Sequence, residues 1–173
     1  MSTRLGILSD THGHPENCRA GLEVLQAAGA THFVHCGDIG DGQDGRLVCD
    51  QLAGTDCRLV RGNCDWDFND LAAYARDLDL QPMGDWGQFT LAGKTFVLTH
   101  GDDRHRVWSL LDGRDPPDYL LTGHTHEPHD HRQARGSKTR WINPGALFRA
   151  RPKTVAVLEI ETDTLELLDV PGI

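Results

Sequence analysis

Five short apolar segments of the chain each end in a polar cluster rich in Asp, Asn and His. The clusters are Ser9-Asp10-Thr11-His12, Cys36-Gly37-Asp38, Arg61-Gly62-Asn63-Cys64-Asp65, Thr99-His100-Gly101-Asp102 and Thr122-Gly123-His124-Thr125-His126. A short apolar run that ends in a polar loop is typical of a buried strand. In open α/β sheets, ligands bind in the crevice beyond the carboxyl ends of the strands. The pattern therefore predicts that five strands deliver these polar groups to one place.

The segments between the clusters favour an α/β fold. In the first two-thirds of the chain, the expected strands are Arg4–Ser9, Thr31–Cys36 and Cys57–Arg61. They alternate with helices that begin at Pro15 or cover Gln43–Ala53 and Phe68–Arg76. In the helix Gln43–Ala53, we expect both Leu47 and Leu52 to face the core.

The remainder is richer in strands. A hairpin is expected over Phe89–Ala92 and Thr95–Thr99, a helix over His105–Leu111, and strands over Asp118–Thr122, Thr139–Asn143, Thr154–Glu159 and Thr164–Val170. Strand–helix alternation followed by paired strands predicts two sheets with mixed strand directions.

Length and charge narrow the class of protein. The 173 residues suit one domain over residues 1–173, and the net charge of −9 disfavours non-specific binding to nucleic acid or anionic membrane. No apolar run approaches the ~18–20 residues of a membrane span, and the N-terminal apolar stretch is too short for a signal peptide. The five cysteines are odd in number and lack C-x-x-C spacing. We therefore expect reduced thiols and a cytoplasmic location.

The polar clusters contain the donors of a metal site. Seven side chains offer carboxylate oxygen, amide oxygen or imidazole nitrogen: Asp10, His12, Asp38, Asn63, His100, His124 and His126. Seven donors are too many for one tetrahedral ion but suit two divalent ions if one group bridges them, and a carboxylate is the natural bridge. Two ions ~3.5–4 Å apart can ionise a shared water and stabilise a phosphoryl group during in-line displacement.

These residues also carry a family resemblance. D-x-H at Asp10–His12, G-D at Gly37–Asp38, G-N-x-D at Gly62–Asp65, H-G at His100–Gly101 and G-H-T-H at Gly123–His126 resemble, in the same order, the calcineurin-like metallophosphoesterase family. Asn143-Pro144-Gly145 resembles the segment after the last metal loop. The short chain resembles the small prokaryotic single-domain phosphodiesterase branch. The resemblance implies a four-layer α/β/β/α sandwich of two mixed sheets flanked by helices.

The resemblance also implies an activity and its residues. We expect a dinuclear metal-dependent phosphodiesterase in which metal-bound hydroxide attacks a small-molecule or nucleotide-like phosphate ester in line. The cofactors are two divalent ions, and the donors suit Mn, Ni, Zn, Fe or Mg. One ion is expected on Asp10, His12, Asp38 and His126. The second is expected on Asn63, His100 and His124, with Asp38 as the bridge. The expected catalytic residues are Asp38, Asn63, Cys64 and His126.

Cys64 departs from the pattern of the wider family, which has His after Gly-Asn. A thiol is a weak hydrogen-bond donor and a poor substitute for an imidazolium group. We therefore expect activated diesters with good leaving groups to be cleaved better than unactivated monoesters.

Several neighbouring residues have two interpretations. Asp65 either supports Cys64 or a metal ligand from behind, or caps the helix before Phe68. Arg104 is a candidate contact to the substrate phosphate, and a solvated loop is the alternative. His129 and His131 extend the H-x-H spacing, but we favour exposed loop residues over a separate zinc site.

Two other functions compete with a phosphodiesterase. The first is a phosphomonoesterase or protein phosphatase. The second is a non-catalytic protein-interaction scaffold of the same fold, as in a retromer subunit, although all seven donor types are intact here. The sequence leaves open whether the chain forms a homo-oligomer.

Overall fold

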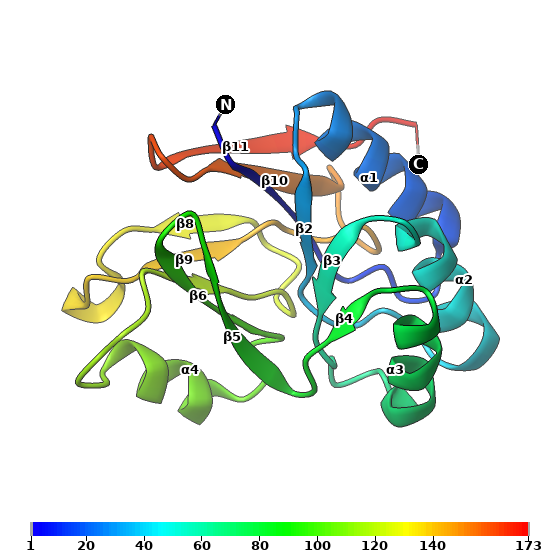
Figure 1. The fold of residues 1–173 in the computed structure, drawn as a ribbon, viewed down its shortest axis with the longest axis horizontal. Helices are drawn as coiled ribbons and strands as arrows, with labels where there is room; N and C mark the ends of the chain where they lie inside the picture. The colour runs from blue at the N-terminus through cyan, green and yellow to red at the C-terminus, as the bar shows by residue number, and fades with distance from the viewer. Residues whose placement is uncertain (1, 173) are drawn as a thin grey trace.

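Two mixed β-sheets form the framework of the protein in a computed structural model that describes residues 2–172 (Figure 1). The first sheet has the order β11-β10-β1-β2-β3-β4. Its strands are β1 (Arg4–Leu8), β2 (His32–His35), β3 (Asp56–Leu59), β4 (Gln81–Pro82), β10 (Thr154–Glu159) and β11 (Thr164–Asp169). Strands β1 to β4 run parallel, whereas β10 and β11 run antiparallel to their neighbours.

The second sheet has the order β5-β6-β7-β9-β8. Its strands are β5 (Trp86–Leu91), β6 (Lys94–Thr99), β7 (Tyr119–Leu121), β8 (His129–His131) and β9 (Arg140–Asn143). The helices are α1 (Pro15–Ala27), α2 (Gly42–Leu52), α3 (Phe68–Asp77), α4 (Arg104–Leu111) and a short 3-10 helix, η1 (Ala134–Gly136). None of the helices within residues 2–172 has the length and apolar character needed to cross a membrane.

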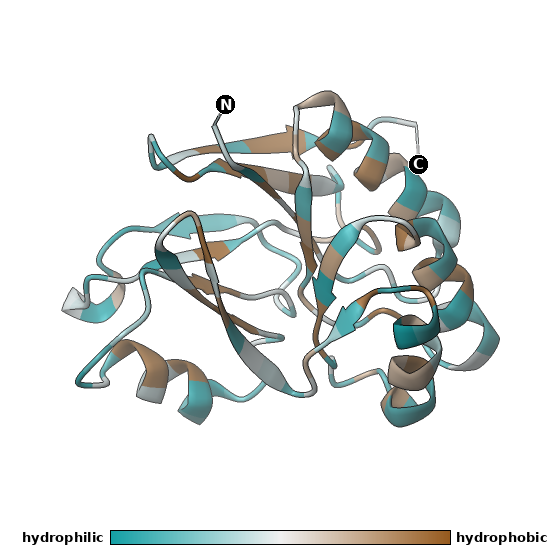
Figure 2. Cartoon of the chain, in the orientation of Figure 1, coloured by the Kyte–Doolittle hydropathy of each residue, from teal (hydrophilic) through white to brown (hydrophobic). Residues whose placement is uncertain are grey.

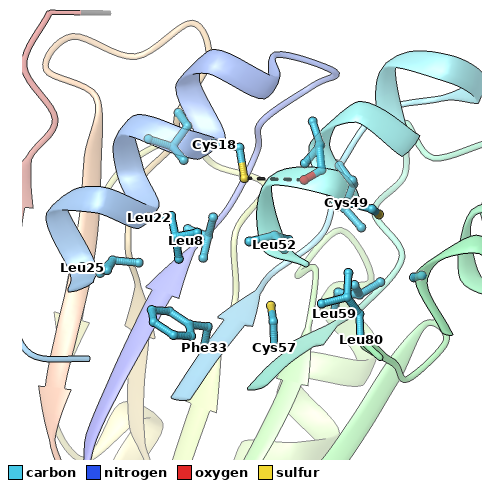
Figure 3. Close-up of a cluster of buried hydrophobic side chains, with 14 of the residues drawn as sticks. Leu8, Cys18, Leu22, Leu25, Phe33, Cys49, Leu52, Cys57, Leu59 and Leu80 are labelled. Carbon is cyan, nitrogen blue, oxygen red and sulfur yellow. Dashed lines mark hydrogen bonds between the residues drawn. The ribbon is translucent and has the colours of Figure 1, made fainter. Parts of the chain in front are cut away.

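Three apolar clusters separate four layers. Leu8 and Leu59 belong to the cluster under α1, α2 and α3, which Figure 3 shows in close-up. Leu5 and Ile7 point the other way and pack between the two sheets with Phe96. The third cluster lies on the far face of the second sheet, against α4. The expected α/β/β/α sandwich of two mixed sheets is therefore confirmed.

Alternation along each strand explains why central strands such as β1 and β7 are apolar. Successive side chains of a strand point to opposite faces, so a strand between two apolar layers needs apolar residues at every position. In β7, Tyr119 and Leu121 face the first sheet while Leu120 faces α4. Figure 2 shows the apolar strands in the interior and hydrophilic residues on much of the outer surface.

The expectation for α2 is half right. Leu52 is fully buried, but Leu47 is 36% exposed and does not belong to the core. The buried face of α2 carries Gly45, Val48, Cys49 and Leu52. These positions follow the i, i+3, i+4, i+7 spacing of one helix face, and Leu47 falls outside that face.

Two short strands differ from the sequence-based expectations. Strand β4 pairs with β3, and β8 pairs with β9 at the edge of the second sheet. His129 and His131 therefore lie on a strand, so their assignment to a loop is wrong. Their rings stack with centroids 4.6 Å apart, and the His129 ring lies 4.9 Å from that of Trp141. The sequence of β8 has no apolar pattern that would predict its pairing with β9. An ion pair between Asp130 and Arg140, with N–O distances of 2.8 Å, helps to hold the strand in place instead.

The two leucines of α2 give a direct test of this packing. We predict that Leu52→Ala lowers the free energy of unfolding by about 2–5 kcal/mol, because it opens a cavity in a closed core. Leu47→Ala on the same helix should change it by no more than about 0.5 kcal/mol. Urea denaturation of both variants measures the difference. Equal losses would contradict the assignment of the buried face.

Candidate metal centre

The register of the parallel strands brings the polar clusters to one edge of the molecule. Leu8, His35 and Leu59 are level across β1, β2 and β3. Leu98 and Leu121 are level across β6 and β7 in the second sheet. The loops that follow these five strands therefore leave their sheets at the same end. The side chains expected as metal ligands come together there.

The first group of donors consists of Asp10, His12 and His126. One ligand atom from each lies within 4.8 Å of the others. Nε2 of His126 is 3.2 Å from Oδ1 of Asp10, and the Nε2 atoms of His12 and His126 are 3.4 Å apart. Oδ1 of Asp10 is buried and accepts no well-aligned hydrogen bond within residues 2–172. A buried carboxylate oxygen facing two imidazole nitrogens fits a divalent cation.

The second group contains Asp38, His100 and Asn63, with His124 beside it. Nδ1 of His100 donates to the carbonyl oxygen of Cys36 at 2.8 Å, which directs Nε2 toward the site. Nε2 lies 3.1 Å from Oδ1 of Asn63 and 3.3 Å from Oδ2 of Asp38. The His124 ring is 5.1 Å from the His100 ring, centroid to centroid.

Asp38 lies between the two groups. Its Oδ2 is 3.5 Å from Nε2 of His12 and 3.3 Å from Nε2 of His100. Its Oδ1 accepts a hydrogen bond from the backbone N–H of Cys64 at 2.8 Å. The carboxylate is therefore held in place by the Cys64 loop while its other oxygen faces both groups.

The charge state of the site shows what it attracts. Burial lowers the pKa of His100, but the hydrogen bond to Asp38 and the charge of that carboxylate outweigh it and raise the pKa to about 9. Burial alone would raise the pKa of Asp38, but His100 and the Cys64 N–H bring it well below its usual range. A proton on His100 thus occupies a place that favours positive charge. The same donors suit metal ions, whose positive charge would replace that of the proton on His100.

Five of the donor residues have left-handed backbone conformations. The φ angles are +56° at Asp10, +46° at His12, +53° at Asp38, +69° at His124 and +59° at His126. Such conformations are uncommon for residues with side chains, and they cluster where function requires them. The turns immediately after the strands direct these side chains into the site, and the packed sheets hold the strain.

Two glycines let the loops approach each other. A Cβ atom on Gly62 would lie 2.1 Å from the backbone nitrogen and from Oδ1 of Asp38. A Cβ atom on Gly123 would lie 1.9 Å from Oγ of Ser9 and 2.6 Å from Oδ2 of Asp10. Neither contact is sterically allowed, so both positions require glycine for the carboxylates to keep their places.

Cys64 and Asp65 have different places in the same loop. The Cys64 thiol groups with His12 and Asp38, and its partial burial and the charge of Asp38 raise its pKa to about 11. Asp65 is buried and accepts backbone N–H groups of Gly62 at 2.7 Å and Gly40 at 2.8 Å. The N-cap residue of α3 is Asp67, so the capping interpretation of Asp65 is wrong. Its carboxylate instead supports the loop that carries Asn63.

The remaining predicted contact, Arg104, does not line the cavity beside Asn63. It is exposed at the first turn of α4 rather than in a loop. A cavity of about 310 Å³ beside Asn63 is lined instead by Arg61 and Arg106. Arg104, His105 and Arg106 all follow His100 in the sequence and are candidate phosphate contacts, and of the three only Arg106 lines this cavity.

Sequence reasoning also missed three residues that hold the donors. Ser9 donates from Oγ to Oδ2 of Asp10 at 2.5 Å. Asn143 donates from Nδ2 to the carbonyl oxygen of Gly123 at 2.7 Å. His35 is fully buried against Oγ1 of Thr11 at 3.0 Å, and burial lowers its pKa to about 4. Ser9 is next to Asp10 in the sequence, and His35 and Asn143 are the last residues of strands that adjoin the donor loops. These positions were the signal that could have identified them.

Known proteins share this architecture. Residues 3–163 match the calcineurin-like phosphoesterase superfamily domain. Phosphodiesterase MJ0936 of Methanocaldococcus jannaschii is 25% identical over 127 residues, which cover 72% of this chain and 74% of that protein. A solved structure described as a novel archaeal phosphodiesterase superposes with a TM-score of 0.84 at 22% identity, covering 96% of this chain and 99% of that chain. The E. coli phosphoesterase Yfce gives 0.65 at 22% identity, covering 97% and 100%.

Metal binding should stabilise the folded chain. We predict that Mn²⁺ at a hundred times its dissociation constant raises the melting temperature of the EDTA-treated protein by about 5–10 °C, because only the folded state assembles the donors. Asp38→Ala should remove most of this shift, whereas Asp77→Ala, an exposed position at the end of α3, should retain it. Differential scanning calorimetry measures both. A full shift in Asp38→Ala would show that the ion binds elsewhere.

Proposed function

We propose that this chain is a dinuclear phosphodiesterase. It belongs to the calcineurin-like phosphoesterase superfamily and is a metal-dependent phosphoric ester hydrolase. Its substrate in this proposal is a small-molecule or nucleotide-like phosphate ester. The observation that carries the proposal is the position of Asp38, whose Oδ2 faces donors of both groups at 3.3 and 3.5 Å. A carboxylate so placed suits a bridge between two ions.

The proposed ligands follow the two groups. Asp10, His12 and His126 would hold one ion and Asn63, His100 and His124 the other, with Asp38 shared. Oxygen and imidazole donors accept Mn, Ni, Zn, Fe or Mg, and we propose Mn²⁺ for the first assays. Such ions, when bound, supply an ionised water and positive charge for the phosphoryl oxygens.

The chain itself fixes the geometry of the reaction. Cys36 and Ser9 orient His100 and Asp10 through hydrogen bonds, so the donors need little rearrangement. Asp38, Asn63 and His126 are the proposed catalytic residues among the ligands. The Cys64 thiol lies beside Asp38 and His12, and a thiol can donate only a weak hydrogen bond to a leaving oxygen.

This weak donor favours diesters over monoesters. An unactivated alkoxide leaving group needs a proton as it departs, whereas a stabilised phenolate does not. We therefore place phosphomonoesterase and protein phosphatase activity second. A non-catalytic scaffold is disfavoured, since Asp10, Asp38 and the histidines converge with a carboxylate oxygen left unpartnered.

Two further expectations are part of the proposal. The five cysteines are all free, and four of them are buried. Reduced thiols support a cytoplasmic location. We also retain one domain over residues 1–173 as a prediction.

Hydrolysis of chromogenic esters tests the activity. We predict that EDTA-stripped protein is inactive on bis-p-nitrophenyl phosphate and that Mn²⁺ or Ni²⁺ restores turnover. Asp38→Ala should lower kcat by more than the roughly 10- to 100-fold that is typical when a residue hydrogen-bonded to a metal ligand is removed. Asp77→Ala is the matched control and should keep wild-type kcat. Near-normal turnover in Asp38→Ala would rule out the bridged mechanism.

A second variant tests the role of Cys64. We predict that Cys64→His raises kcat on an alkyl monoester by roughly 10- to 100-fold, because imidazolium can protonate the leaving alkoxide oxygen, and changes kcat on p-nitrophenyl phosphate little. Turnover of bis-p-nitrophenyl phosphate should change little. A marked loss of diesterase activity in this variant would mean that the thiol does more than donate weakly.

A further inference from the structure

A groove leads away from the metal centre along the loop that carries Asn63. The cavity of about 310 Å³ beside Asn63 is lined by Arg61 and Asp85. A second cavity of about 280 Å³ is lined by the same two residues and by Trp66 and Arg76. Arg61 and Asp85 line both cavities, so the two cavities adjoin, and together we call them the groove.

Trp66 is the most exposed large apolar side chain within residues 2–172, at 75%. No aromatic ring or guanidinium group is recorded against it in this part of the chain. Trp108, by comparison, lies 6.1 Å from the His105 ring and 5.4 Å from the Arg135 guanidinium. Most of the Trp66 indole is thus available to a ligand.

The backbone around Trp66 is held firmly. The Asp65 carboxylate accepts from the N–H of Gly62, and the carbonyl oxygen of Asp65 accepts from Nε of Arg61 at 3.2 Å. Phe68, two residues after Trp66, is buried in the cluster under α3. The exposed indole therefore stands on a fixed loop, which lowers the entropy lost when a ligand stacks on it.

Arginines line the path between the two ends. Arg61 lies 3.8 Å from Asp85, and both side chains are exposed, so the pair is weak and open to exchange for an anion. Arg76 takes part in no ion pair within residues 2–172. Guanidinium groups bind phosphate oxygens in a bidentate manner. The groove therefore offers an aromatic platform at one end and guanidinium groups along its wall, beside the acidic side chains of Asp85, Asp102 and Asp103.

We propose that this groove binds a nucleoside arm of the diester, with its base stacked on Trp66 and its phosphate beside Arg61 at the metal centre. The inference rests on the proposed function and narrows its substrate class to nucleotide esters. Trp66 is the third residue after Asn63, so their backbones are at most about 10 Å apart. One ribose links a phosphate to a base over a span of this order. Stacking on an aromatic side chain accepts any base.

Two ligands that differ only in the base give the test. We expect adenosine 5′-monophosphate to inhibit bis-p-nitrophenyl phosphate hydrolysis by the Mn²⁺-loaded enzyme more strongly than ribose 5-phosphate does. Trp66→Ala should raise the inhibition constant of the nucleotide by roughly 5- to 100-fold and leave that of the sugar phosphate unchanged. Trp66→Phe should restore most of the difference. Trp108→Ala is the matched control and should change neither constant.

The outcomes separate this inference from the proposed function. If the wild-type enzyme hydrolyses the diester but Trp66→Ala binds both ligands as the wild type does, the groove assignment is wrong and the phosphodiesterase remains. If no variant or metal gives turnover, the proposed function fails. Isothermal titration calorimetry with the same two ligands then still decides whether Trp66 binds the base.

Discussion

The parallel pairing of β1, β2 and β3 is the constraint on which the rest of the protein depends. It places the ends of three strands level, so the loops after Leu8, His35 and Leu59 begin side by side. The second sheet repeats the arrangement with β6 and β7. Burial of both faces of these strands fixes the register, because a shift by one residue would turn every apolar side chain toward the wrong layer. The metal centre is a direct result of packing far from it.

The same edge collects negative charge that the fold does not neutralise by itself. Asp10 and Asp38 are buried, and the basic groups nearest to them are histidines rather than lysines or arginines. A buried carboxylate without a cation is costly, so the apo site draws a proton onto His100. Imidazole can release that proton to solvent when a metal ion takes its place on the ring nitrogen, whereas a lysine or arginine would keep its positive charge. The choice of histidine keeps the site available to metal ions.

Much of this arrangement could be predicted from the sequence because its signals are local. Each apolar run ends at a polar cluster, and the order of strands and helices follows from hydrophobic periodicity. The position of Leu47 depended on where α2 begins, and β8 has no apolar pattern because it forms through pairing at an edge. The wall that Arg61 and Asp85 give to both cavities joins loops distant in sequence. Such features arise only once the sheets have packed.

The left-handed backbone conformations after the strand ends cost stability, and the side chains at these positions are the donors of the site. Glycine at Asp10, His12 or Asp38 would relax the backbone, since a positive φ costs glycine nothing. The same exchange would delete a donor from the site. A search for thermostable variants would therefore be drawn to these positions and would return well-folded proteins without function. In this protein, the positions where substitution would most relieve backbone strain are the positions that supply the donors of the site.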